Sequence, residues 1–214
     1  MKITLLLAED HKIMRDGLRQ LLDQQKDISV VGVADNGRMA VELARQYTPN
    51  VIIMDIVMPE LNGAEATKQI VAKCLHTKVL ALSMHSDSQH IFNMVKAGVS
   101  GYLLKDCSFE ELLKAIHAVA AGKTYFSSDI AGHVITQCMR QIRHKDSVPR
   151  ELTSREREVL QLLAEGKSTQ MIASVLNLHE RTVDVHRYKI RQKLNLHNIA
   201  DLTKYAVREG LTSL

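Results

Sequence analysis

The chain has 214 residues, of which 45% are hydrophobic and 24% are charged, and its formal net charge is +4. This composition is typical of a globular protein of one or two domains and excludes a disordered or collagen-like chain. No apolar run approaches the roughly 20 residues of a membrane span, and the apolar start is too short for a signal peptide, so we expect a cytoplasmic protein without a membrane partner. The three cysteines are widely spaced, which argues against a disulfide framework or a zinc site.

The first 125 residues alternate short apolar segments with longer amphipathic ones. The apolar segments lie at residues 3–7, 30–34, 51–54, 79–82 and 102–104. In the first intervening helix we expect one apolar stripe, formed by Ile13, Leu18, Leu21 and Leu22. Strands that alternate with helices in this way indicate an α/β fold, here a doubly wound sheet of five parallel strands.

The chain changes character after residue 125. Residues 126–149 predict a partly helical linker, with weak helical spacing at 127–143 and a polar end at Pro149. Residues 150–214 predict four helices, at 154–165, 168–176, 180–194 and 199–209. This last part has 11 cationic and 8 acidic residues, whereas residues 1–125 have 14 of each. We therefore expect domains at 1–125 and 150–214, the second being small, basic and all-helical.

Ionisable and polar side chains stand at the ends of the predicted strands. Glu9 and Asp10 follow the first strand, Asp55 the third, Ser83 the fourth and Lys105 the fifth. The carboxyl ends of parallel strands meet at one edge of the sheet, where crowded carboxylates favour a bound Mg²⁺. Such a site can hold a phosphoryl group on an aspartate whose charge a lysine neutralises. Each residue alone has an ordinary structural explanation, but together they predict a phosphate-handling site.

Three segments, residues 8–11, 54–63 and 97–105, resemble the signature sequences of bacterial response-regulator receiver domains. The resemblance covers residues 1–125. It implies that Asp55 is phosphorylated by a sensor histidine kinase, and that Mg²⁺ is bound by Glu9, Asp10, Asp55 and the backbone carbonyl of Val57. The acidic pair is Glu-Asp here and more commonly Asp-Asp in the family, which makes Asp10 the more direct ligand.

The same resemblance assigns roles to three further residues. It implies that Lys105 contacts the phosphoryl group, and that Ser83 and Tyr102 move inward together on phosphorylation. A phosphatase of the haloacid-dehalogenase type also forms an aspartyl phosphate, but it needs a second acid two residues after the nucleophile, where Val57 stands. We therefore expect no enzyme activity beyond slow self-dephosphorylation.

Residues 168–194 have the dimensions of a helix-turn-helix, although an ordinary helical hairpin has similar spacing. On a helical wheel Val183, Ile190 and Leu194 lie on one side, which we expect to face the core. The remaining positions suit a helix in the major groove of DNA. The residues expected to contact DNA are Arg181, Asp184, Val185, Arg187, Tyr188, Lys189, Arg191, Gln192 and Lys193.

Residues 152–160, 172–173 and 182–187 resemble the LuxR-type DNA-binding domain of the NarL/FixJ class of response regulators. The resemblance covers residues 150–214 and implies base contacts around Asp184, Val185 and Tyr188. Asp184 departs from members that carry Lys at this position. The resemblance also implies a homodimer through the last helix, although the same residues could belong to the core. They are Ile199, Leu202, Tyr205 and Ala206.

The two resemblances together imply a two-component response regulator. In this interpretation the protein is a transcription factor that is activated by phosphorylation of Asp55. It binds promoter DNA through the helix at 180–194, and it dimerises on phosphorylation or on DNA. The alternative is a phosphorylation-independent DNA-binding regulator in which the receiver domain serves only for dimerisation.

Overall fold

The computed structural model describes residues 2–84, 88–127, 130, 132 and 152–212. The chain divides into two compact units, Met1–Arg140 and Gln141–Leu214. The expected linker at 126–149 and its helix at 127–143 lie almost wholly outside the described residues and stay predictions. Within the described ranges, no helix combines the length and the apolar character that a membrane span requires.

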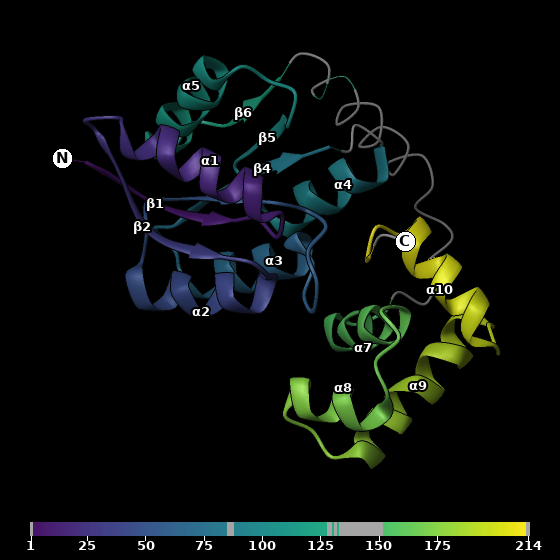
Figure 1. Ribbon diagram of the computed structural model, residues 1–214. Helices are drawn as coiled ribbons and strands as arrows, with labels where there is room; N and C mark the ends of the chain where they lie inside the picture. Colours follow the sequence, from purple (N-terminus) through teal and green to yellow (C-terminus); the bar gives the residue numbers. More distant parts are fainter. Residues whose placement is uncertain (1, 85–87, 128–129, 131, 133–151, 213–214) are drawn as a thin grey trace. The chain divides into compact units, whose positions relative to one another are not determined.

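The first unit is built on a parallel sheet (Figure 1). All five predicted strands are confirmed, as β1 (Ile3–Ala8), β2 (Ile28–Ala34), β3 (Val51–Met54), β4 (Lys78–Ser83) and β5 (Gly101–Leu104). A sixth strand, β6 (Tyr125–Phe126), pairs in parallel with β5. The strand order is β2-β1-β3-β4-β5-β6. The sequence did not predict β6 because two residues are too few to show a period.

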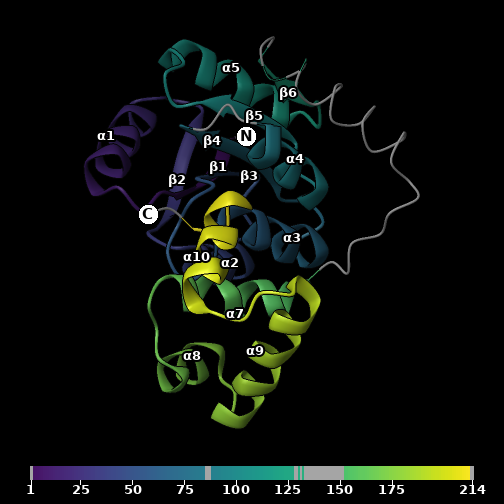
Figure 2. The ribbon, with the colours of Figure 1, turned by 90° about the vertical axis from the view of Figure 1, so that its right-hand side faces the viewer.

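Helices cover both faces of this sheet (Figures 1 and 2). One face is covered by α1 (Lys12–Asp23) and α5 (Phe109–Ala120), and the other by α2 (Gly37–Tyr47), α3 (Gly63–Lys73) and α4 (Ser88–Ala97). Successive residues of a strand point to opposite faces. In β1, Leu5 and Leu7 therefore join the core on the α1 and α5 side, whereas Leu6 and Ala8 join the core on the other side.

The apolar stripe expected on α1 is wrong in two of its members. Ile13 is 90% exposed and Leu21 is 41% exposed, whereas Leu22 is fully buried. The residues of α1 that face the sheet are Met14, Leu18 and Leu22. These three are spaced four residues apart, and at about 100° per residue that spacing keeps them on one side of a helix. Ile13 precedes Leu18 by five residues, which places it on a different side.

The second unit contains the four predicted helices. They are α7 (Ser154–Ala164), α8 (Thr169–Leu176), α9 (Glu180–Leu194) and α10 (Ile199–Arg208). A capping box of Thr153 and Glu156 begins α7. Asn177 ends α8 in the left-handed conformation, with φ of 53°, which allows the tight turn into α9. The helices share one core, which includes the fully buried Ile172 and Ile190.

Candidate functional site

The sheet brings the predicted phosphate-handling residues to one edge. In the pairing of β1 with β3, Ala8 lies beside Met54, so Glu9 and Asp55 leave neighbouring strands at the same level. The Asp55 amide donates to the Ala8 carbonyl at 2.9 Å, which fixes this level. On the other side of β4, the Lys105 amide donates to the Ser83 carbonyl at 2.8 Å. The strand ends are therefore adjacent, as expected.

Lys105 joins two of these carboxylates directly. Its Nζ lies 2.8 Å from Glu9 Oε2 and 2.8 Å from Asp55 Oδ2. The other Asp55 oxygen, Oδ1, accepts a hydrogen bond from the Ile56 amide at 2.7 Å. The side chains of Lys105, Glu9 and Asp55 are at most 6% exposed. One buried cation thus stands between two buried anions, which leaves the group with excess negative charge.

The burial and charges of this group change the acidity of its members. Burial, followed by the negative charge of Glu9, raises the pKa of Asp55 to about 6, and the cation of Lys105 opposes that rise. Burial by itself would lower the pKa of Lys105, but the adjacent carboxylates of Asp55 and Glu9 outweigh it and raise the pKa. Lys105 therefore stays charged and favours the ionised form of Asp55, against the effects of burial and of Glu9.

The same edge has the donor set of a metal site. One possible ligand atom from each of Glu9, Asp10, His11 and Asp55 lies within 4.8 Å of the others. Asp10 Oδ1 is buried and accepts no hydrogen bond, although His11 Nδ1 lies only 2.9 Å away. A buried carboxylate oxygen without a donor is costly unless a cation compensates it. The residues therefore fit a hard divalent cation with oxygen ligands. The Val57 side chain packs against the core.

Two residues that the sequence analysis did not single out hold this edge in place. Arg15 of α1 donates from Nη1 to the backbone carbonyls of Glu9, at 2.7 Å, and Asp10, at 3.2 Å. Gly63 begins α3 so close to Asp55 that a Cβ there would lie 2.1 Å from the Asp55 carbonyl oxygen. In the sequence these roles are marked only by the place of each residue. Arg15 is a cation one turn into the helix after the acidic pair, and Gly63 directly follows the Asn62 cap.

Ser83 and Tyr102 both lie in the interior of the first unit. Both are fully buried. Tyr102 belongs to the same core cluster as Ile91 and Met94 of α4. The ring of Tyr102 thus forms part of the core between the sheet and α4, and the expected joint movement of Ser83 and Tyr102 on phosphorylation stays a prediction.

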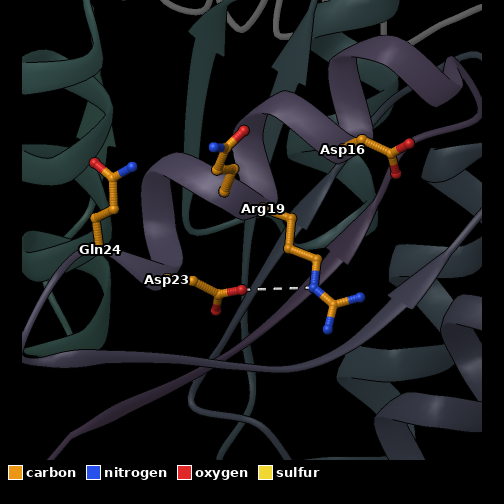
Figure 3. A pocket seen from close by; sticks show the side chains of 5 residues that line it. Asp16, Arg19, Asp23 and Gln24 are labelled. Atoms are coloured by element: carbon orange, nitrogen blue, oxygen red, sulfur yellow. Dashed lines mark ion pairs between the residues drawn. The ribbon is translucent and has the colours of Figure 1, made fainter.

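A separate hollow lies along α1 (Figure 3). It is lined by Asp16, Arg19, Gln20, Asp23 and Gln24. Figure 3 shows Arg19 turned toward Asp23, and their Nε and Oδ2 atoms are 3.6 Å apart. None of these side chains belongs to the carboxylate cluster, and the pair is half-exposed. Asp16 therefore offers a matched acidic control outside the site.

The predicted DNA-contacting residues of α9 fall into two groups. One group is exposed on the outer face of the helix and consists of Arg181, Asp184, Val185, Tyr188, Lys189 and Gln192. The other three, Arg187, Arg191 and Lys193, are partly buried. Val183 and Ile190 are fully buried, which confirms the predicted core side of the helix.

Two of the partly buried cations connect α9 to the neighbouring helices of the unit by hydrogen bonds. Lys193 Nζ donates to the buried Glu156 carboxylate of α7 at 2.7 Å. Burial would raise the pKa of Glu156, but this bond and those from Thr153 outweigh it and lower the pKa. Arg187 Nη1 donates to Thr169 Oγ1 of α8 at 2.7 Å. Neither contact was visible in the sequence, because each joins residues of two helices.

The expected dimer residues of α10 also fall into two groups, one buried and one at least partly exposed. Leu202 is 2% exposed and Ala206 is fully buried, and both belong to the core of the unit. These two therefore follow the alternative core interpretation and do not form a dimer surface. Ile199 is 50% exposed and Tyr205 is partly buried, so their role in dimerisation stays a prediction.

Two family models match the chain. "Response regulator receiver domain" matches residues 5–117, which is more than half of the chain, and "Bacterial regulatory proteins, luxR family" matches residues 150–206. The chain belongs to the response regulators with a LuxR-type DNA-binding domain. The matched ranges contain the carboxylate cluster and the α8–α9 pair, respectively.

Relatives of this response regulator match it along nearly its whole length. The transcriptional regulatory protein YxjL of Bacillus subtilis is 37% identical and covers 98% of this chain and 97% of its own. The nitrate/nitrite response regulator protein NarL of Escherichia coli is 34% identical, over 97% and 96%. Among solved structures, the response regulator ChrA of a heme-sensing two-component system is 30% identical, with a TM-score of 0.53 over 98% of both chains.

Proposed function

We propose that this response regulator is a phosphorylation-activated transcription factor whose phosphoryl acceptor is Asp55. The observation that carries the proposal is the position of Lys105 Nζ, which lies 2.8 Å from a carboxylate oxygen of Asp55 among buried acids at the carboxyl edge of the sheet. A phosphoryl donor, for which a sensor histidine kinase is the proposed source, meets there an anionic nucleophile and a cation that neutralises the added charge.

The phosphoryl transfer needs little more than this geometry. A carboxylate oxygen of Asp55 attacks phosphorus, the bond from phosphorus to the donor's imidazole nitrogen breaks, and its electron pair stays on that nitrogen. Lys105 remains beside the new phosphoryl oxygens. Val57 stands two residues after Asp55 and provides no acid–base group. We therefore propose an acceptor with slow self-dephosphorylation, and not a phosphatase.

Mg²⁺ is the proposed cofactor at this edge. Asp10, Asp55 and Glu9, together with the backbone carbonyl of Val57, would hold it, and Asp10 Oδ1 is the buried oxygen that lacks a hydrogen-bond donor. When bound, the cation supplies charge neutralisation to the transferring phosphoryl group. Arg15 supports the site by fixing the backbone that carries Glu9 and Asp10.

The proposed output is binding of promoter DNA by α9, in the cytoplasm where that DNA lies. The helix presents Arg181 and Lys189 for phosphates, and Val185 and Tyr188 for base edges, on one exposed face. Two copies joined near Ile199 and Tyr205 would read a site with two half-sites. Since Ser83 and Tyr102 are already buried, phosphorylation would act by stabilising this arrangement over others.

The experiment is the intact mass of the wild-type protein, Asp55→Asn and Asp16→Asn after incubation with acetyl phosphate and Mg²⁺. We expect one added phosphoryl group on the wild type and on Asp16→Asn, because Asp16 is exposed on α1 outside the cluster, and none on Asp55→Asn. An adduct on Asp55→Asn would refute the assignment of the acceptor.

A second measurement separates the proposal from the alternative regulator that does not depend on phosphorylation. Binding of the wild-type protein to promoter DNA is compared with and without acetyl phosphate. Stronger binding of the phosphorylated wild type, without a change in Asp55→Asn, supports the switch. Equal binding in all four samples would favour a receiver domain that serves only for dimerisation.

A further inference from the structure

Asp184 is an acidic residue in the middle of an exposed helix face whose charged neighbours Arg181 and Lys189 are cations. Its side chain is 62% exposed. Beside it on the outer face of α9 stand Val185, 47% exposed, and Tyr188, 65% exposed. A carboxylate on a surface that approaches DNA phosphates is repelled by them. Such a residue weakens binding to every sequence unless it gains a specific partner in the groove.

A cation from the same helix lies beside this carboxylate. Arg187 Nη1 lies 3.5 Å from Asp184 Oδ1 and donates to Thr169 Oγ1 at 2.7 Å. Arg187 is only 30% exposed, so its guanidinium is held between α8 and α9. The contact neutralises part of the charge on Asp184 and engages Oδ1. In the described part of the chain, Oδ2 has no hydrogen-bond partner and remains available as an acceptor.

We propose that Asp184 selects cytosine in the major groove by accepting a hydrogen bond from the cytosine N4 amino group. The inference rests on the proposed binding of DNA by α9 and names the base that this position reads. Arg187 is its positioning residue, and Thr169 anchors Arg187 across the helix pair.

The chemistry of the groove leaves few partners for a carboxylate. A carboxylate has no hydrogen to donate. It is therefore repelled by guanine, which presents the acceptors O6 and N7, and by thymine, which presents the acceptor O4. Adenine offers the N6 amino group, but its N7 acceptor lies beside that donor and opposes a carboxylate with two oxygens. Cytosine presents the N4 donor without an acceptor on the same base edge. It is therefore the base that Asp184 favours.

The test is selection of binding sites from a random duplex pool by the full-length protein, treated with acetyl phosphate and Mg²⁺. We expect the wild type to prefer cytosine at one position of each half-site by about tenfold, the effect of one good base contact. Asp184→Asn keeps the shape of the side chain and adds an amide donor, which matches adenine N7 and N6. We expect the preference at that position to change from cytosine to adenine.

Glu209→Gln is the matched control, because it also removes one negative charge from the unit but lies beyond α9, beside Arg208. It should keep the wild-type preference at every position. An Asp184→Asn protein with the wild-type preference throughout would overturn the inference. A wild-type protein that selects no sequence at all would instead refute the proposed function on which the inference rests.

The positioning role has its own pair of variants. Thr169→Val removes the hydroxyl that accepts from Arg187, whereas Thr169→Ser retains it. We expect Thr169→Val to weaken the cytosine preference severalfold and Thr169→Ser to restore it. If Thr169→Val selects cytosine as strongly as the wild type does, Arg187 does not position Asp184.

Discussion

The charge balance of the acidic edge depends on one residue, Lys105. It is the cation that contacts Glu9 and Asp55, and both carboxylates are almost completely buried. Without that cation the two anions face each other in a medium of low polarity, where their repulsion is weakly screened. The same arrangement that suits phosphoryl transfer is therefore destabilising when it is incomplete.

We expect Lys105→Met to lower the free energy of unfolding by about 3 kcal/mol, the usual cost of breaking a buried ion pair. Addition of Mg²⁺ should recover part of this loss, because a cation at the cluster again neutralises the carboxylates. Urea unfolding with and without Mg²⁺ measures both effects. Lys114→Met, which removes an exposed lysine of α5, should change the free energy by less than about 0.5 kcal/mol.

At the level of elements, the position of α3 is set by contact between backbones. Gly63 at the start of α3 donates its amide to the Ile56 carbonyl at 2.7 Å, and the Asp55 carbonyl oxygen would lie only 2.1 Å from a Cβ at this position. By contrast, a Cβ on Gly17 in α1 would have no neighbour within 4 Å. A side chain is therefore excluded at Gly63 and has room at Gly17.

We expect Gly63→Ala to destabilise the receiver unit by about 2 kcal/mol or more, because the backbone around Asp55 has to shift. It should also slow phosphorylation of Asp55 by acetyl phosphate. Gly17→Ala should stabilise the unit by up to about 1 kcal/mol, because alanine favours the helix. Thermal unfolding and intact mass over time provide the two readouts. Equal stability of the two variants would contradict the close backbone approach at Gly63.

A second link between elements joins α5 to the turn before β2. The ring of His117 has an acceptor at each nitrogen, the Leu113 carbonyl at Nδ1 and Asp27 Oδ2 at Nε2, both at 2.6 Å. Both nitrogens must donate, so the contact requires the protonated ring. The hydrogen bond to Asp27 raises the pKa of His117 against the opposing effect of burial, and the pKa of Asp27 is lowered by the same bond.

The stabilisation by this pair should depend on pH. The His117 contribution is complete below the ordinary histidine pKa of about 6.5 and is lost as the pH rises through the raised pKa. The Asp27 contribution is complete above the ordinary pKa of 3.8 and is lost as the pH falls through the lowered one. We therefore expect the urea midpoint of the wild type to exceed that of His117→Gln most at about pH 5.5, and little at about pH 9.

A double-mutant cycle with Asp27→Asn checks the partner. If the two residues act through their mutual bond, the second substitution should add little to the first at about pH 5.5. Additive losses would show that the two side chains act separately. The effect is small in either case, because both side chains are about half-exposed.

At the scale of the whole molecule, two compact units carry two different chemistries. The receiver unit concentrates buried carboxylates at a sheet edge, whereas the second unit presents cations on an exposed helix face. Neither unit provides the other's chemistry. In the proposed function, phosphorylation of Asp55 would therefore regulate DNA binding by changing the populations of conformations of the chain.

We expect Lys189→Ala to weaken DNA binding for all sequences to a similar extent, because the proposed partner of this exposed lysine is a phosphate and not a base. The slope of log affinity against log salt should fall by about 1. Titrations at several salt concentrations measure this slope. Lys123→Ala, in the receiver unit, should leave it unchanged, and a sequence-dependent loss for Lys189→Ala would indicate a base contact.

The fold class, the strands β1 to β5, the four C-terminal helices and the residues of the acidic edge could all be predicted from the sequence. These features depend on local periodicity and on the rule that parallel strands end at one edge, so they can be recognised along the chain. The strand ends Glu9, Asp55 and Lys105 lie together for this reason.

Which side chains are exposed and which are buried became clear from the packing of the elements. It placed Leu202 and Ala206 of α10 in the core, exposed Ile13 on α1, and joined Arg187 to Thr169. It also brought Arg15 onto the backbone of the acidic pair. Burial and side-chain contacts between elements depend on how those elements pack, and residue type and spacing along one helix do not specify that packing.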